Sequence, residues 1–187
     1  MKNLTFYSSS LLFVIGISLI PYNCKAKDVK LTRQEKKDLR QTELNTNYQA
    51  IDTLIERKTF VIEADYLQDQ NGSPVPVNSV LNYILVDSMR VVLQTGSNFR
   101  RGYNGVGGVT AQGNIQNYKV VKDPKNLSYN VSFTVMTNVG IFDVSMNISA
   151  NTNATAIITG LSRGSLTWQG YIQNLYKSDV YKGQETF

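Results

Sequence analysis

The feature that most constrains the fold is a change of hydrophobic period at Thr59. From there on, apolar residues recur at every second position, which is the period of a half-buried β-strand. In the first such segment the inward positions are expected to be Phe60, Ile62, Ala64 and Tyr66. Glu63 and Asp65 fall between them and are expected on the solvated outer face. Further strands are expected at residues 83–86, 89–93, 115–121, 128–136, 141–149, 154–159 and 165–172.

Turn-forming residues separate these segments at short, regular intervals. Asp87-Ser88 predicts a tight hairpin turn, and clusters rich in Asn, Gly and Pro occupy 71–76, 122–126, 138–140 and 151–153. Long helical crossovers are missing, which argues against a parallel α/β fold. The pattern predicts that residues 59–187 form one antiparallel meander, closed as a sandwich or a partly open barrel.

Residues 27–58 are expected to form a linker and an amphipathic helix. Thr32 and Glu35 have the spacing of a capping box, which marks a helix start. Apolar residues then follow at helical spacing, at Leu44, Tyr48, Ile51 and Ile55. A helix with one such stripe packs against the sheet, so the fold class is mainly β, of the α+β type.

Residues 1–26 are typical of a signal peptide. The ten apolar residues from Leu11 to Ile20 are too few to span a bilayer as a helix, and Pro21 ends the run. Cleavage after Ala26 would satisfy the small-residue rule. Lipidation at Cys24 is a second possibility, although the residues before it match a lipoprotein signal poorly, and an uncleaved anchor is a third. Each places the domain outside the cytoplasm, in the periplasm or at the outer membrane, with membrane attachment only through an anchor.

Two absences exclude large classes of function. The chain has no histidine, so catalysis by histidine and metal binding by imidazole are excluded. Its single cysteine is Cys24, which leaves residues 27–187 without a thiol nucleophile, a disulfide or a thiolate zinc site. From Thr59 onward there are nine basic and eight acidic residues, so the net charge of +5 is no sign of nucleic-acid binding. Neither a cofactor nor a metal is expected.

Several short motifs together resemble a known family. They are Asn82-Tyr-Ile-Leu-Val-Asp87, the run from Arg90 to Gln94, Gly102-Tyr-Asn-Gly-Val-Gly-Gly108, Gly113-Asn-Ile-Gln-Asn-Tyr118 and Trp168-Gln-Gly-Tyr-Ile172. With the preceding helix, this set is similar to domain of unknown function 4251 (DUF4251), whose members are exported proteins of Bacteroidetes. The resemblance covers roughly residues 35–175. It implies an envelope location and an unassigned function, and it carries over no catalytic residues.

Two sets of residues are candidates for ligand binding. In the glycine-rich stretch 99–113, five glycines with Arg100 and Arg101 could form a backbone nest whose N–H groups hold a phosphate or carboxylate, and Tyr103 is a further candidate for ligand binding. The stretch lacks P-loop and dinucleotide spacing, so a long hairpin loop is the preferred interpretation. The aromatic residues, Trp168 among them, could line a pocket for a sugar or an apolar ligand, or could simply form the core.

The leading functional hypothesis is therefore a non-enzymatic envelope protein that binds a small ligand or a partner surface. A structural or assembly role, with exposed sheet edges pairing between molecules, is one alternative. A glycan hydrolase that uses two carboxylates is another, and it requires two acidic side chains facing each other within about 10 Å in a cleft.

Overall fold

The computed structural model describes residues 31–97, 104–160 and 164–186. The chain divides into two units, Met1–Thr32 and Arg33–Phe187, and the second contains the whole fold described below. The predicted signal segment and Cys24 lie outside the described residues.

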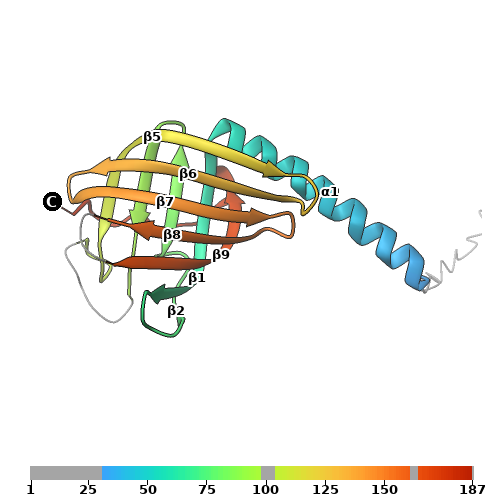
Figure 1. Ribbon diagram of the computed structural model, residues 1–187. Coiled ribbons are helices and arrows are strands. Elements are labelled where there is room, and N and C mark those ends of the chain that lie inside the picture. The colour runs from blue at the N-terminus through green and yellow to red at the C-terminus, as the bar shows by residue number, and fades with distance from the viewer. Residues whose placement is uncertain (1–30, 98–103, 161–163, 187) are drawn as a thin grey trace, which may run out of the picture. The chain divides into compact units, whose positions relative to one another are not determined.

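The second unit is a closed antiparallel barrel preceded by one helix (Figure 1). The helix is α1 (Arg33–Arg57), and the strands are β1 (Thr59–Asp69), β2 (Val75–Pro76), β3 (Tyr83–Asp87), β4 (Arg90–Gln94), β5 (Thr110–Asp123), β6 (Ser128–Thr137), β7 (Gly140–Ser149), β8 (Asn153–Thr159) and β9 (Ser165–Asn174). Each strand from β3 to β9 pairs with the next, and β9 pairs with β1. The expected mainly β meander with one helix is confirmed. The expected sandwich or partly open barrel is not, because eight strands form a complete ring.

Strand β1 closes the ring because it is long enough to pair on both edges. Its first five residues pair with β3, its end pairs with β2, and its other edge pairs with β9 from Phe60 to Asp69. A bulge between Ala64 and Tyr66 reverses which residues face inward. The inward assignment of Tyr66 was therefore wrong: this side chain is 47% exposed, and Leu67 packs on the core instead.

Alternation along the other strands fills the interior. Strands β6, β7 and β8 bury every second side chain, as the sequence predicts, and the buried residues form one continuous core. The β3–β4 hairpin is also confirmed, but its turn is shifted by one residue. Asp87 pairs with Arg90, so the two-residue turn is Ser88-Met89, with Ser88 at a φ of 56°.

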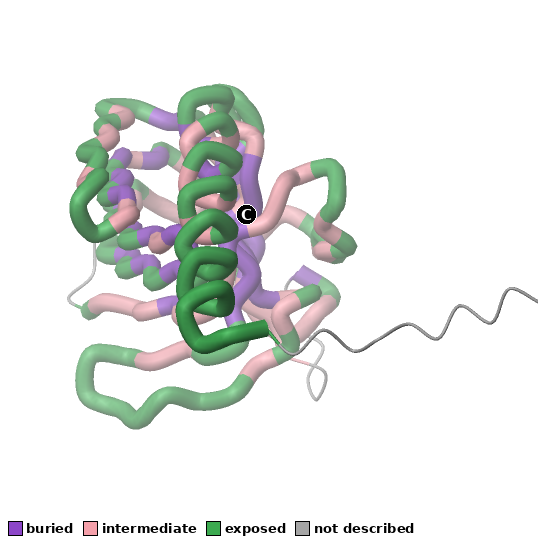
Figure 2. The backbone as a smooth tube through the Cα atoms, turned by 90° about the vertical axis from the view of Figure 1, so that its right-hand side faces the viewer, coloured by how far each residue is buried: buried purple, intermediate pink, exposed green. Residues whose placement is uncertain are grey.

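Helix α1 covers one end of the barrel with its C-terminal half (Figure 2). Ile51 and Ile55 are buried in the barrel core, and Tyr48 packs beside them, so the predicted apolar stripe is confirmed. The first eleven residues of the helix, 33–43, are exposed. They extend away from the strands in Figure 1.

The segment after β9 covers the outside of β3 and β4. Leu175 and Val180 pack on a second apolar cluster made of Val61, Tyr83 and Val92, which face away from the barrel interior. The same segment covers Glu63, whose carboxylate accepts hydrogen bonds from Tyr171 and Ser178, each at 2.7 Å. Glu63 is only 5% exposed, so the expected solvation of this residue was wrong. It does face outward, but it lies beneath the C-terminal segment.

Candidate ligand-binding cavity

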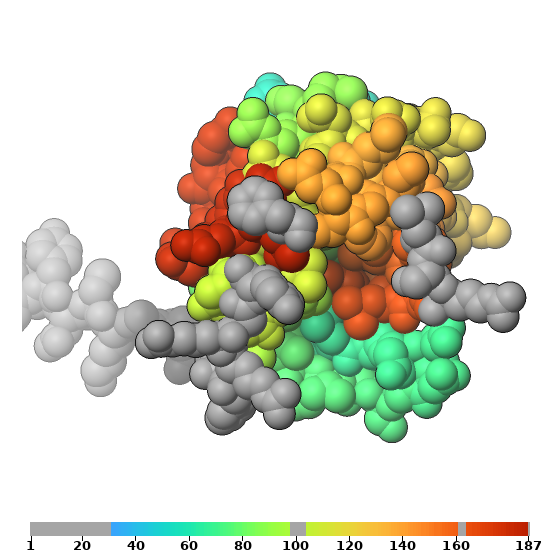
Figure 3. All heavy atoms as spheres, turned by 90° about the vertical axis from the view of Figure 1, so that its left-hand side faces the viewer, coloured from blue at the N-terminus to red at the C-terminus, as the bar shows by residue number. Residues whose placement is uncertain are grey.

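A cavity of about 520 Å³ opens at the end of the barrel opposite α1. Figure 3 faces this end. The walls come from the ends of β4, β5, β8 and β9 and from the β6–β7 hairpin, so segments far apart in the sequence share one hollow. The described lining residues are Leu93, Thr95, Val109, Ala111, Val139, Phe142, Ile158, Gly160, Gly164, Ser165, Leu166 and Trp168. The volume is within the usual range for small-molecule sites, about 300–1,000 Å³.

The lining residues divide into a buried floor and an exposed rim. Four apolar side chains at inward positions of the strands are buried, namely Leu93, Ala111, Ile158 and Trp168. Val109, Gly160 and Gly164 are exposed and mark the entrance. Among the described residues, the exposed members of the lining thus lie at the outside and the apolar floor lies deeper.

Small residues keep this end of the barrel hollow. Ala111 is a small side chain of β5 in the lining. Ala156 of β8 is another small residue, and it pairs directly with Trp168 of β9. Gly160 lies against the ring of Phe142, and a Cβ atom at Gly160 would meet that ring at 3.1 Å. At the other end, by contrast, Tyr118, Tyr129 and the isoleucines of α1 fill the interior.

In the floor of the cavity, the indole N–H of Trp168 is a buried polar group without a partner among the described residues. Its side chain is 1% exposed, and its indole Nε1–H has no hydrogen-bond acceptor among the described residues. Buried donors are normally paired, because an unpaired one loses its hydrogen bond to water without replacement. Trp168, a residue that lines the cavity, therefore has a buried N–H donor without a partner among the described residues.

No charged side chain occurs among the described residues that line the cavity. Two hydroxyls, from Thr95 and Ser165, are the other polar side-chain groups, and both residues are half-buried. The cavity thus offers large apolar surface with few polar groups, and nothing in its described lining compensates a buried ligand charge.

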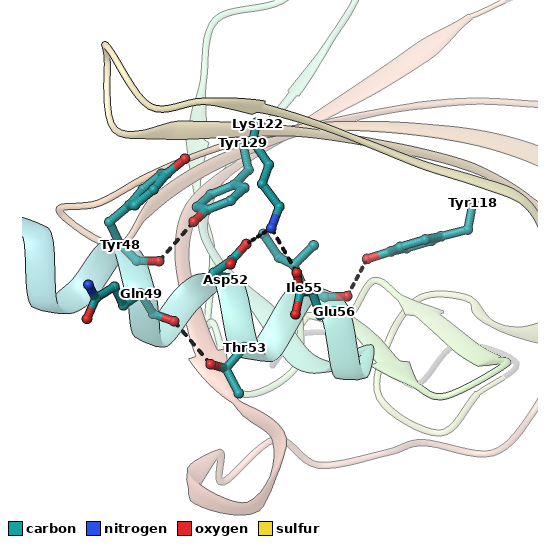
Figure 4. A network of polar contacts seen from close by, with 9 residues as sticks. All are labelled: Tyr48, Gln49, Asp52, Thr53, Ile55, Glu56, Tyr118, Lys122 and Tyr129. Atoms are coloured by element: carbon teal, nitrogen blue, oxygen red, sulfur yellow. Dashed lines mark hydrogen bonds and ion pairs between the residues drawn. The ribbon is translucent and has the colours of Figure 1, made fainter.

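A cluster of charged side chains, Lys122, Asp52 and Glu56, lies instead where α1 meets the barrel (Figure 4). The Lys122 ammonium lies 2.7 Å from Asp52 and 2.8 Å from Glu56. Hydrogen bonds to Asp52 and then Glu56 raise the pKa of Lys122 above its usual value. Tyr118 donates a hydrogen bond to the carbonyl of Ile55 at 3.0 Å, and burial raises the pKa of its phenol. These groups hold the helix in place, and each has a partner.

Of the residues proposed from sequence, the structure places only Trp168. Arg100, Arg101 and Tyr103 lie outside the described residues. Their neighbour Asn104 is buried: its amide donates to the Thr95 carbonyl, and its oxygen accepts from the backbone N–H groups of Val106 and Gly108. Sequence reasoning missed the rest of the lining. The small residues near the strand ends, Ala111 and Gly160 among them, were the available signal.

A carboxylate hydrolase would need two acidic side chains that face each other in a cleft. None of the described residues that line the cavity is acidic. A second, smaller hollow of about 340 Å³ lies over the outer face of β5 to β8 and contains Asp143, whose carboxylate accepts a hydrogen bond from the Thr134 hydroxyl at 2.7 Å. Across the described part of the chain, no three acidic residues are grouped so that they could hold a metal ion.

Comparison with known proteins places the chain in a family. The profile of the family described as "Domain of unknown function (DUF4251)" matches residues 42–172, well over half of the chain. The chain belongs to the DUF4251 family. The resemblance seen in the sequence motifs is thereby confirmed.

A solved DUF4251 structure has a similar fold. It is the crystal structure, at 1.95 Å, of a DUF4251 family protein from Bacteroides eggerthii DSM 20697. That protein is 27% identical in sequence, with a TM-score of 0.60, and the similarity covers 72% of this chain and 91% of the other. Among curated proteins no significant match was found. No helix in the described ranges is both long and apolar enough to cross a membrane.

Proposed function

We propose that this DUF4251 protein is a non-enzymatic binding protein that holds a small apolar ligand in the open end of its barrel. The observation that carries the proposal is the cavity: a hollow of about 520 Å³ with a buried apolar floor, in a barrel small enough to have been filled by side chains. Eight-stranded barrels that keep such a hollow commonly hold one small ligand.

The construction of the two ends supports this proposal. One end is sealed by α1, with Ile51 and Ile55 inserted into the core and Tyr129 bonded to the helix backbone. The other end lacks such a plug among the described residues and is lined by small and apolar residues. In the described part of the chain, the barrel is sealed at the α1 end and hollow at the other, which suits entry of a ligand from the hollow end.

We further propose that the protein works in the cell envelope, in the periplasm or at the outer membrane. The support is the apolar run from Leu11 to Ile20, followed by small residues at Cys24 and Ala26. Attachment to a membrane would require lipidation at Cys24 or retention of the signal segment. Intact mass of the protein produced with its own signal separates cleavage after Ala26 from acylation.

The binding proposal is tested with the only tryptophan in the chain. Because Trp168 lines the cavity, occupancy by a neutral apolar probe such as N-phenyl-1-naphthylamine should quench its fluorescence by energy transfer and brighten the probe. We expect saturable binding of one probe per chain, with Kd in the micromolar range or tighter. Native mass spectrometry of the gently purified protein reports any ligand carried from the cell.

Two matched variants locate the site. Val139→Phe adds a ring to a residue that lines the cavity near its entrance, whereas Val121→Phe adds the same ring to an exposed position of β5, 63% exposed, outside the cavity. Binding should fall at least tenfold in V139F and stay unchanged in V121F. Equal binding by both variants, or no saturable binding by the native protein, would refute the proposal. Self-association without ligand uptake would favour the assembly role instead.

A further inference from the structure

A buried polar network connects one wall of the cavity, formed by Thr95 and Val109, to the C-terminal segment. Resting on the binding function proposed above, we infer that Gln94 and Asn104 are positioning residues for this wall, and that through them residues 181–186 and a bound ligand stabilise each other. The inference joins two independent observations: the hydrogen bonds that fix the wall, and the hydrogen bonds that hold the end of the chain to the same residues.

The wall itself is a short extension of the β4–β5 hairpin. The last ladder pair of these strands is Gln94 with Thr110, and Thr95 and Val109 lie one residue beyond it. The Thr95 N–H donates to the Val109 carbonyl at 2.9 Å, and the Val109 N–H donates to the Thr95 hydroxyl at 3.1 Å. Because both residues line the cavity, the position of this extension sets part of the cavity's width.

Asn104 fixes the extension from its buried side. The residue is 1% exposed, and its amide donates to the Thr95 carbonyl and the Thr110 hydroxyl, each at 3.1 Å. Its side-chain oxygen accepts from the N–H groups of Val106 and Gly108 at 3.1 and 3.0 Å. A shift of the wall would break bonds of a buried amide, and buried polar groups without partners are costly. Asn104 therefore favours one position of the wall.

Gln94 links this network to the C-terminal segment. The residue is fully buried, and its side-chain oxygen accepts from the Thr110 hydroxyl at 2.9 Å and from the Gly183 N–H at 2.7 Å. Its amide donates to the Tyr181 carbonyl at 2.7 Å. One side chain thus holds both the start of β5 and the segment that covers it.

Backbone hydrogen bonds join the same partners. The Gln184 N–H donates to the Asn104 carbonyl, and the Thr186 N–H donates to the Thr110 carbonyl, each at 2.9 Å. The residues that position the wall are therefore the residues that hold the segment, and opening of the segment removes bonds from them. A ligand that binds best to the closed wall must favour the docked segment by the same factor, because such coupling is reciprocal.

Gly183→Ala tests the coupling in the full-length protein. A Cβ atom at Gly183 would lie 2.6 Å from the carbonyl oxygen of Asn104, and φ there is not positive, so the substitution acts through this close approach. Tyr129→Phe is the matched control, because it removes a hydrogen bond at the opposite end of the barrel. We expect N-phenyl-1-naphthylamine to bind about fivefold more weakly or worse in G183A, and within about twofold of the native affinity in Y129F.

Two results with these variants would overturn the inference. Native affinity in G183A would mean that the segment does not position the wall. An equal loss in both variants would mean that affinity follows overall stability and not the contact with Asn104.

Hydrogen exchange of the native protein gives a second measurement that needs no variant. Saturation with N-phenyl-1-naphthylamine should slow the exchange of residues 104–110 and 181–186 by about fivefold or more, and leave the exposed residues 33–43 of α1 unchanged. Unchanged exchange of 181–186 in the saturated protein would overturn the coupling alone. Absence of saturable binding by the native protein would instead remove the proposed binding function, and the inference with it.

Discussion

The hydroxyl of Tyr129 donates a hydrogen bond to the backbone carbonyl of Tyr48 at 3.0 Å, and the two rings stack with centroids 4.6 Å apart. One side chain of β6 is thus bonded to the backbone and stacked on the ring of the same residue of α1 (Figure 4). This pair, together with the hydrogen bond from Tyr118 to the carbonyl of Ile55, fixes the helix over the end of the barrel opposite the cavity.

Removing the Tyr129 hydroxyl should loosen the helix without unfolding the barrel. Tyr129→Phe keeps the stacking and loses one buried hydrogen bond, which should lower the free energy of unfolding by about 1 kcal/mol. Tyr129→Leu also loses the stacked ring and should lower it by about 2–3 kcal/mol. Urea unfolding followed by circular dichroism measures both. Tyr66→Phe, at an exposed position of β1, is the control and should change stability by less than about 0.5 kcal/mol. Equal effects of Y129F and Y66F would contradict the helix-fixing role.

Closure of the barrel should depend on Gly170. A Cβ atom at this position would lie 1.9 Å from the carbonyl oxygen of Glu63, where β9 meets the bulge of β1. Gly170→Ala should therefore force the two strands apart and lower the free energy of unfolding by about 3 kcal/mol or more. Thermal unfolding measures the loss, and size-exclusion chromatography should show association through the freed strand edges.

Gly72→Ala is the matched control for that change. Its Cβ would meet the exposed carboxylate of Asp69 at 2.6 Å, and a surface side chain of that kind can move away. It should leave the melting temperature within a few degrees of the native value. A Gly170→Ala protein that stays monomeric and melts like the control would show that β1 and β9 can close without the close approach.

The sequence predicted the strands well because alternation is a local property. The buried positions of β6 to β8 follow from every second residue being apolar, and the stripe from Tyr48 to Ile55 follows from helical spacing. The bulge after Ala64 interrupts β1 without a residue that marks it, so Tyr66 was assigned to the wrong face. Ring closure could not be seen in any local pattern either, since the pairs of β1 with β9 run from Asp69 with Leu166, 97 positions apart, to Phe60 with Asn174, 114 positions apart.

Of the residues that line the candidate site, the sequence analysis named only Trp168. Trp168 could be chosen from sequence because it is the only tryptophan. Residues such as Ala111 and Phe142 line the cavity only because four strand ends and a hairpin converge there, which no local pattern shows. The burial of Glu63 was missed for a similar reason, because the segment that covers it follows β9, more than 100 residues later.

The C-terminal segment should depend on Gln94, a fully buried residue of β4. Its amide donates to the Tyr181 carbonyl at 2.7 Å, and its oxygen accepts from the Gly183 N–H at 2.7 Å. Gln94→Met has a similar volume but cannot replace these bonds, so residues 180–186 should be held less firmly and open more often. We expect a loss of about 1–3 kcal/mol and faster hydrogen exchange of that segment, read by mass spectrometry. Gln41→Met on the exposed part of α1 is the control. Unchanged exchange in Q94M would show that the packing of Val180 and the backbone hydrogen bonds of Tyr181, Gln184 and Thr186 hold the segment without Gln94.

Alkaline pH should weaken the same covering segment through Tyr171. The hydrogen bond to Glu63, together with burial, raises the pKa of the Tyr171 phenol. A raised pKa means that the folded protein keeps this proton where the unfolded chain loses it. The stabilising contribution is therefore complete below the unfolded value, about pH 10, and is lost as pH rises through the folded pKa. Stability should decline above about pH 10.

Tyr171→Phe tests this dependence, because it removes the titrating phenol and the bond to Glu63 together. The variant should be less stable than the native protein at pH 7, by about 1–2 kcal/mol, since a buried carboxylate loses one of its two donors. The difference should shrink as pH rises from 10 to 11.5. Buried Tyr83, Tyr118 and Tyr129, whose pKa values burial also raises, will still make the variant lose stability in this range, so the comparison must be made at each pH by urea unfolding. A stability gap that stays constant or widens above pH 10 would mean that Tyr171 and Glu63 do not share a proton-dependent contact in solution.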